Sequence, residues 1–176
     1  RRKLVTLSLQ NDSPDIIGMQ EVLVSQLEYL VNNLPGYGSI GVGRDDGRTK
    51  GEYTPILYKS DRFDLLDQAS FWLSPTPADT GSVGWDAALT RICTWAHFKE
   101  KVSGFEFYFL NTHFDHMGHM ARTESAKLIL RFIGNETGGL PVILTGDFNC
   151  SPEEEPYRVF SGDNDSLIDA CMVAQG

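Results

Sequence analysis

The stretch Pro141-Val142-Ile143-Leu144-Thr145-Gly146-Asp147-Phe148-Asn149 runs from a short apolar segment directly into two polar side chains. The apolar run at residues 141–144 predicts a buried strand. Asp147 and Asn149 then stand where that strand ends. Loops at strand ends are held by a rigid sheet and commonly carry the functional residues of α/β proteins. These two side chains are therefore the first candidates for a functional site.

Outward from this stretch, the chain alternates between predicted strands and helices. We predict strands at residues 16–19, 37–42, 55–58 and 63–71, and an antiparallel hairpin from the β-branched and aromatic residues of 92–98 and 105–110. Apolar residues at helical spacing predict helices at 22–33 and 121–133, which Pro35-Gly36 and Gly134-Asn135 are expected to end. Residues 43–51 and 74–84 are expected to be loops. Because the hairpin is antiparallel, we expect an α/β sandwich and not a purely parallel doubly wound sheet.

The bulk composition limits both the size of the fold and its partners. The 176 residues fit a single domain, residues 1–176, and are few for two. No apolar run approaches the roughly 18 residues that a membrane span needs. The net charge of −9 argues against a broad basic surface for a polyanion, although a bound divalent cation reverses the local sign of a site. The three cysteines lie far apart and are odd in number, which predicts unpaired thiols.

Glu21 stands just past the predicted strand at residues 16–19. It could simply begin a helix, where the helix dipole favours a carboxylate. Alternatively, it is a hard oxygen ligand for Mg²⁺, which typically takes one or two carboxylates and keeps waters as its other ligands. Asp147 and Asn149 have a similar pair of interpretations. They form an Asx turn, or a carboxylate that orients an attacking water beside an amide that donates to a phosphoryl oxygen.

His113 follows the apolar residues 105–110, with His116 and His119 close behind. Three histidines could form the site of a zinc hydrolase, since catalytic zinc often takes three protein ligands. The interpretation that we favour makes His113 alone a donor to the charge that develops on a phosphoryl group, or an acid for the leaving group.

Arg91 and Arg44 are candidates for substrate binding. A guanidinium can grip phosphoryl oxygens through two parallel hydrogen bonds. The alternative for each is a solvated surface charge.

Three motifs occur in this order: Gly18-Met19-Gln20-Glu21, Asn111-Thr112-His113 and Gly146-Asp147-Phe148-Asn149. Together they resemble the signatures of the endonuclease/exonuclease/phosphatase superfamily. Residues 16–21, 52–59, 84–95 and 111–122 further resemble a bacterial branch of uncharacterised hydrolases related to its deadenylase-like members. The resemblance spans nearly the whole chain and implies a four-layer α/β sandwich, in which two mixed β-sheets pack together with helices outside.

The same resemblance implies a metal-dependent phosphoesterase that hydrolyses a phosphodiester or phosphomonoester by in-line attack of an activated water. Glu21 would hold Mg²⁺ or Mn²⁺, and His113 would assist the transition state. Asp147 and Asn149 would position the water and the phosphate. The fold leaves the substrate open among a phosphorylated small molecule, a phospholipid head group and nucleic acid. Nothing in the sequence indicates an obligate protein partner or a transmembrane segment.

Members of the superfamily ordinarily begin with a strand whose asparagine helps to bind the metal and end in a Ser-Asp-His strand that completes the centre. Residues 1–176 contain neither segment. The resemblance therefore predicts a chain that lacks the first and last strands and is inactive on its own, since residues that act as a unit fail together. A non-catalytic binding module on the same fold is the alternative from another functional class.

Overall fold

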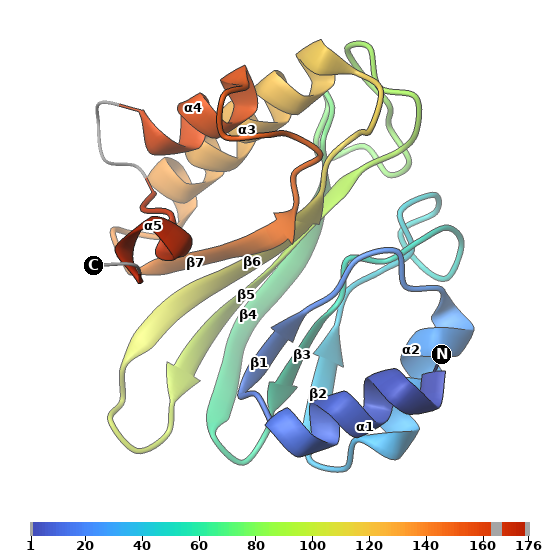
Figure 1. Cartoon of the computed structure of the whole chain (residues 1–176), viewed down its shortest axis with the longest axis vertical. Coiled ribbons are helices and arrows are strands. Elements are labelled where there is room, and N and C mark those ends of the chain that lie inside the picture. Colours follow the sequence, from blue (N-terminus) through green and yellow to red (C-terminus); the bar gives the residue numbers. More distant parts are fainter. Residues whose placement is uncertain (1, 163–166, 175–176) are drawn as a thin grey trace.

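The computed structural model describes residues 2–162 and 167–174, and Figure 1 shows the arrangement of its elements. In chain order these elements are α1 (Arg2–Asp12), β1 (Ile16–Gly18), α2 (Val24–Asn33), β2 (Tyr37–Ile40), β3 (Ile56–Lys59), β4 (Phe63–Trp72), β5 (Ile92–Glu100), β6 (Glu106–His113), α3 (His119–Glu136), β7 (Val142–Asp147), α4 (Glu155–Ser161) and α5 (Ala170–Val173). Every strand predicted from the sequence forms, and α2 and α3 lie where the two helices were predicted.

The strands form two sheets. One sheet has the order β1-β3-β2, and both of its pairs are antiparallel. The other has the order β4-β5-β6-β7, in which β6 and β7 run parallel and the remaining pairs are antiparallel. The predicted hairpin is the β5–β6 pair. Within the described residues, β1 and β7 are edge strands of their sheets.

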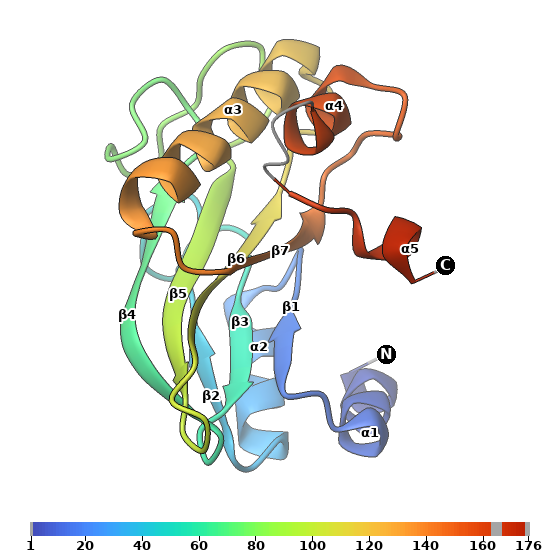
Figure 2. The same cartoon turned by 90° about the vertical axis from the view of Figure 1, so that its left-hand side faces the viewer.

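Hydrophobic clusters separate four layers. Ile56 and Leu57 are neighbours on β3 and point to opposite faces of their sheet, as successive strand residues must. Leu57 packs with Leu30 of α2, whereas Ile56 packs with Phe98 of the facing sheet. The outer face of the four-stranded sheet packs against α3 through a third cluster that contains Ile129. Figures 1 and 2 show α1 and α2 outside one sheet and α3 and α4 outside the other. The expected four-layer α/β sandwich is confirmed.

Strand β6 carries this alternation toward the candidate site. Phe107 and Phe109 belong to the cluster between the two sheets, whereas Tyr108 and Leu110 belong to the cluster under α3. Because the side chains of a strand alternate, Asn111 and His113 continue the face that looks toward the three-stranded sheet. The last residues of β6 thus leave the hydrophobic core on the side where the two sheets meet.

The predicted end of α3 at Gly134-Asn135 is wrong, because the helix continues to Glu136. An interior glycine costs only about 1 kcal/mol relative to alanine, which the packing of a long helix outweighs. The helix ends where Thr137 Oγ1 donates to Ile133 O at 2.8 Å and Gly138 takes a φ of 61°. This ending is a glycine signal four residues beyond the predicted one.

The second helix begins at Val24 and not at Val22. Val22 instead forms an isolated antiparallel bridge with Tyr53. Glu21, immediately before it, has a φ of 58°, which no helical residue has. The candidate carboxylate therefore lies in an irregular segment between β1 and α2.

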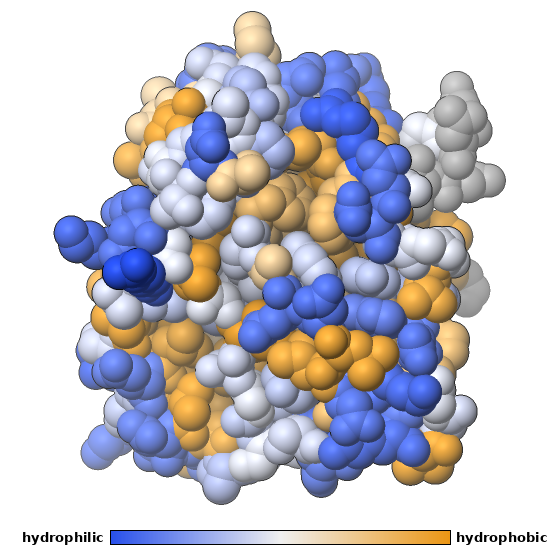
Figure 3. All heavy atoms as spheres, turned by 180° about the vertical axis from the view of Figure 1, so that it is seen from behind, coloured by the Kyte–Doolittle hydropathy of each residue, from blue (hydrophilic) through white to orange (hydrophobic). Residues whose placement is uncertain are grey.

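The surface mixes hydrophobic and hydrophilic areas, as the face seen from behind in Figure 3 shows. The most exposed large hydrophobic side chains include Val102 in the β5–β6 turn, Leu4 in α1 and Met172 in α5. Among the described residues, no helix combines the length and the apolar character that crossing a membrane would require.

Candidate functional site

The parallel strands β6 and β7 end side by side on His113 and Asp147. These two residues are direct partners in the strand pairing, and His113 Nε2 lies 3.8 Å from Asp147 Oδ2. The close approach needs Gly146, because a Cβ at that position would lie 2.5 Å from the carbonyl oxygen of Thr112. The Asp147 side chain is about half exposed, at 53%, whereas the His113 side chain is 8% exposed. A buried imidazole and an accessible carboxylate thus meet at one edge of the sheet.

Asn149 lies in the tight turn that follows β7. Its backbone N–H donates to Asp147 Oδ1 at 2.9 Å, which is an Asx-type turn, and its φ is 47°. Its side-chain Nδ2 donates to the carbonyl oxygen of Phe114 at 2.9 Å. The structural interpretation of the Asp-x-Asn motif therefore holds. It does not exclude a chemical role, since the amide has a second hydrogen and Asp147 has a second oxygen.

Glu21 is held in its left-handed conformation by hydrogen bonds on both sides. Met19 N donates to Pro55 O at 3.1 Å before it, and Tyr53 N donates to Val22 O at 2.8 Å after it. A non-glycine residue at positive φ carries a strain of about 1–3 kcal/mol that persists only where the surroundings enforce it. The side chain is exposed, and within the described residues its carboxylate forms no ion pair or hydrogen bond.

The oxygen chemistry of these side chains fits a hard cation. Mg²⁺ commonly binds one or two carboxylates and takes water for its remaining positions. Glu21 offers such an oxygen ligand with no competing internal partner. Over residues 2–162 and 167–174, no three His, Cys, Asp or Glu side chains gather as a group that could hold a metal. Among the described residues, the structure therefore offers Glu21 as a single free oxygen ligand and no three-histidine site.

The other two histidines face arginines. Arg91 Nη2 donates to His116 Nδ1 at 3.1 Å, and Arg122 Nη2 donates to His119 Nδ1 at 3.0 Å. An imidazole nitrogen that accepts from a guanidinium has no lone pair left there for a metal. Both Nδ1 atoms are thus engaged by arginines, and among the described residues the three histidines do not form a group that could hold a metal, contrary to what the zinc alternative requires.

Asp115 is the buried centre of this second group, which we call the arginine cluster: Asp115, Arg91, Arg122, His116 and His119. The Asp115 side chain is 1% exposed, and its Oδ2 lies 3.6 Å from Arg91 Nε. Its carboxylate also accepts hydrogen bonds, at 2.8–3.2 Å, from the backbone N–H groups of Ala88, Leu89, Met117 and Gly118. Burial opposes ionisation, but these four bonds prevail and lower its pKa to about 2.

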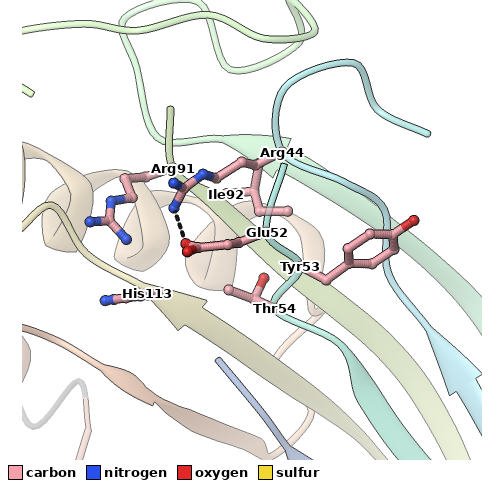
Figure 4. A pocket seen from close by; sticks show the side chains of 7 residues that line it. All are labelled: Arg44, Glu52, Tyr53, Thr54, Arg91, Ile92 and His113. Carbon is pink, nitrogen blue, oxygen red and sulfur yellow. Dashed lines mark ion pairs between the residues drawn. The ribbon is translucent and has the colours of Figure 1, made fainter. Parts of the chain in front are cut away.

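Arg91 also faces the candidate site. With Arg44, Glu52, Thr54 and His113 it lines a cavity of about 10 Å³, room for about one water molecule (Figure 4). Its Nε and Nη1 are buried and have no hydrogen-bond partner among the described residues. Arg44 is engaged differently, because its Nη1 lies 2.7 Å from Glu52 Oε2. Neither of these two candidate substrate-binding arginines is a solvated surface charge, since the side chain of Arg91 is 5% exposed and that of Arg44 is 12% exposed.

The electrostatic surroundings favour a neutral His113. Burial lowers its pKa below the ordinary 6.5, and the positive charge of Arg91 lowers it further. The carboxylates of Asp147, Glu21 and Glu52 act in the opposite direction but do not reverse the shift. Gln20, the residue before Glu21, hydrogen-bonds Asn111 at 2.8 Å, two residues before His113, so the segment of Glu21 adjoins the end of β6. We use the name strand-end site for Glu21, His113, Asp147 and Asn149.

Sequence reasoning did not single out three of the polar residues here: Glu52, Asn111 and Asp115. Glu52 lies between the loop predicted at residues 43–51 and the strand predicted at 55–58. Asn111 follows the predicted strand in sequence, yet it belongs to β6 and is 0% exposed. Its burial could have been suspected from the polar Asn-Thr pair between an aromatic run and a histidine. Asp115 was missed because two of its four backbone partners, Ala88 and Leu89, lie in a distant loop, although the other two are nearby in the chain.

Comparisons with known proteins agree with this fold. A family model described as "Endonuclease/Exonuclease/phosphatase family" matches residues 1–172. The crystal structure of an endonuclease/exonuclease/phosphatase from Bacteroides vulgatus is 45% identical, with a TM-score of 0.90 over 93% of this chain and 63% of that one. A mannosyl-6-phosphatase from Bacteroides thetaiotaomicron is 47% identical, with a TM-score of 0.87 over 92% and 61%. An uncharacterized protein of Acanthamoeba polyphaga mimivirus is 30% identical over 157 residues, which are 85% of this chain and 58% of that protein. The chain thus spans about six tenths of the length of these relatives.

Proposed function

The chain belongs to the endonuclease/exonuclease/phosphatase family, and from this premise we propose that the protein hydrolyses phosphoric esters with Mg²⁺ or Mn²⁺ as its cofactor. The observation that carries the proposal is the meeting of His113 and Asp147 at 3.8 Å on adjacent strand ends. The unpaired carboxylate of Glu21 follows Gln20, which hydrogen-bonds Asn111 on the strand that ends in His113. Such a set can orient water, support an anionic phosphoryl group and hold a hard cation.

Glu21 is the residue that would hold the cation. When bound, a divalent cation supplies charge neutralisation at the phosphoryl oxygens and makes water easier to deprotonate. The strained backbone at Glu21 supports this role, because left-handed non-glycine residues concentrate at functional sites.

Asp147 is the residue that would orient the attacking water. One of its oxygens accepts from Asn149 N, which fixes the carboxylate and leaves the other oxygen to accept a water hydrogen. Asn149 adds a neutral donor toward a phosphoryl oxygen, and His113 adds a second. A neutral imidazole carries one N–H, so His113 can donate to developing negative charge without first being protonated.

The two arginines have unequal roles in this proposal. Arg91 has an unpaired Nη1 on the cavity shared with His113, so it would attract the substrate phosphate or grip one of its oxygens. Arg44 is neutralised by Glu52 and would contribute less unless that ion pair opens. Guanidinium groups are well suited to phosphate because of their planar pair of donors.

A phosphorylated small molecule is the substrate class that we favour. The relative from Bacteroides thetaiotaomicron that is 47% identical is named as a mannosyl-6-phosphatase. The net charge of −9 disfavours long polyanions, whose binding relies on broad basic surfaces. We therefore propose a sugar phosphate ahead of a phospholipid head group or nucleic acid.

The test uses the full-length protein that contains this chain. We expect hydrolysis of mannose 6-phosphate, nitrophenyl phosphate or a nitrophenyl phosphodiester with Mg²⁺ or Mn²⁺, and loss of that activity in excess chelator. Activity that is undiminished in chelator would contradict the metal requirement. No hydrolysis of any phosphate ester, with any divalent cation, would favour a non-catalytic binding module.

The variant Glu21→Gln tests whether Glu21 binds the metal. The change is nearly isosteric, so we expect a higher metal concentration for half-maximal activity with little change in the melting temperature of the metal-free protein. A fall in melting temperature without metal, and no change in metal requirement, would instead make Glu21 a structural residue.

A further inference from the structure

Asn111 is a fully buried amide at the point where the two sheets meet. It lies on β6, two residues before His113 and on the same face of the strand, and it is 0% exposed. A buried amide is costly unless all of its hydrogen-bonding groups find partners. At Asn111 every one of them does.

The four hydrogen bonds of Asn111 reach three other segments. Its Nδ2 donates to Met19 O at 2.7 Å and to Pro55 O at 3.0 Å. Its Oδ1 accepts from Gln20 Nε2 at 2.8 Å and from Thr145 Oγ1 at 3.0 Å. An amide offers two donor hydrogens and two acceptor lone pairs, so its capacity is filled.

These partners are the residues beside the strand-end site. Met19 and Gln20 directly precede Glu21, and Thr145 lies two residues before Asp147 on β7. Pro55 O, the second acceptor of Nδ2, also receives the bond from Met19 N that helps to hold the backbone before Glu21. One side chain therefore ties together the segments that carry Glu21, His113 and Asp147.

Gly18 shows how closely the segments are drawn together. A Cβ at Gly18 would lie 2.3 Å from Thr145 Oγ1 and 2.7 Å from Asn111 Oδ1, distances that no real Cβ tolerates. The absence of a side chain there lets β1 approach both β6 and β7. The contact is therefore short enough for Asn111 to reach the backbone of Met19.

We infer that Asn111 is a positioning residue that fixes the Glu21 carboxylate relative to the His113–Asp147 pair. The inference rests on the proposed function, because it concerns the cation that Glu21 would hold. Glu21 lies in the segment that follows β1 of the three-stranded sheet, whereas His113 and Asp147 end strands of the four-stranded sheet, so contacts between these segments help to set its distance from them. Groups that orient a metal ligand typically change metal affinity or activity about 10–100-fold when they are removed.

Asn111→Asp is the sharpest substitution, because it keeps the shape and the acceptor Oδ1 but replaces the donor Nδ2 with an oxygen that cannot donate to Met19 O and Pro55 O. Thr94→Val is the matched control. Thr94 pairs with Asn111 across β5 and β6, is also 0% exposed, and its hydroxyl also bridges the sheets, to Thr54 Oγ1 at 3.1 Å. Thr94 makes none of the bonds to the segment before Glu21.

The experiment is a Mn²⁺ titration of the full-length protein, followed by electron paramagnetic resonance of the free ion, with kcat, KM and melting temperature measured in parallel. We expect Asn111→Asp to weaken Mn²⁺ binding about tenfold or more and to lower kcat more than it raises KM. Thr94→Val is expected to lower the melting temperature and to leave Mn²⁺ affinity within about twofold. Equal Mn²⁺ affinity and kcat in the two variants would overturn the inference.

A second variant covers the case in which Asn111→Asp does not fold. Gln20→Leu removes only the bond from Gln20 Nε2, at the partly buried end of the network, and is expected to weaken Mn²⁺ binding about threefold or more. Wild-type affinity in that variant would count against the inference. A wild-type protein that binds no Mn²⁺ and ignores chelator would instead refute the proposed function, and the inference with it.

Discussion

The strand-end site and the arginine cluster are built from similar residue types and adjoin on the chain, yet they treat their charges in opposite ways. Asp147 is half exposed, and Glu21 has no internal partner among the described residues. Asp115, only two residues after His113, accepts four backbone hydrogen bonds and faces Arg91. The carboxylates of the strand-end site keep oxygens free, whereas both oxygens of the Asp115 carboxylate are occupied.

The difference separates a chemical role from a structural one. A carboxylate that must bind a cation or water has to keep at least one oxygen free of internal partners. A carboxylate that holds loops in place must spend them, because a buried charge without partners costs several kcal/mol. Residue type alone therefore does not identify the site. The degree to which each group is already satisfied does, and each region predicts its own response to substitution.

The largest expected effect is on stability at the arginine cluster. Asp115→Asn removes the charge opposite Arg91 and weakens the bonds that join residues 88–89 to residues 117–118. We expect a loss of about 3 kcal/mol in the free energy of unfolding, as is typical when one partner of a buried ion pair is removed. Denaturant titration measures it. Asp64→Asn is the control, because its exposed ion pair with Lys101 should contribute under about 1 kcal/mol.

The pH dependence of the stability difference between the wild type and Asp115→Asn tests whether that difference is electrostatic. The folded-state pKa of Asp115, about 2, lies below its ordinary value of 3.8. Its ionisation therefore stabilises the fold above pH 3.8, and that contribution is lost as the pH falls toward 2. Asparagine does not titrate, so the stability gap between wild type and Asp115→Asn should narrow over this window. A gap that stayed constant would mean that packing, and not charge, is responsible.

The next effect is on catalysis at the strand-end site. His113→Ala removes the donor that lies beside Asp147, and we expect kcat of the full-length protein to fall about 100-fold or more. His116→Ala and His119→Ala should lower kcat much less, since both imidazoles already face arginines. Equal losses in all three variants, together with loss of copurifying zinc, would instead support the zinc hydrolase.

The sequence predicted the frame of the strand-end site because its signals are local. The apolar run before Asp147 and the aromatic hairpin each fix a strand within a few residues. The resemblance to a known superfamily then supplied the layer arrangement that periodicity alone does not give. The end of α3 was placed wrongly at Gly134 because propensity is a weak local term that tertiary packing overrides.

The contacts that tune the site escaped prediction because they are non-local. Gln20 and Asn111 are 91 residues apart in the chain and meet only because two sheets pack together. The ionisation of Asp115 depends in part on the backbone N–H groups of Ala88 and Leu89, in a loop whose path has no periodic signal. The positive φ of Glu21 likewise follows from the bonds on either side of it, which no motif encodes.

The smallest expected effect comes from Glu21→Gly. Glycine removes the strain of a left-handed residue, about 1–2 kcal/mol, but it also costs about 0.5–1 kcal/mol in backbone entropy. The two terms nearly cancel, so we expect the free energy of unfolding to change by less than about 1 kcal/mol in either direction. The same substitution at Glu28, exposed in the middle of α2, should destabilise the protein by about 1 kcal/mol.

Activity should respond in the opposite way to stability, with the larger loss in Glu21→Gly and the smaller loss in Glu28→Gly. Glu21→Gly removes the proposed metal ligand and should abolish Mg²⁺-stimulated hydrolysis, whereas Glu28→Gly should leave it within about twofold, because surface changes away from the site are usually near neutral. Denaturant titration and metal-stimulated turnover of the full-length proteins measure the two effects. If Glu21→Gly were as destabilising as a core mutation while the activity survived, Glu21 would be a structural residue. The distinction between a chemical role for the strand-end site and a structural role for the arginine cluster would then be wrong for Glu21.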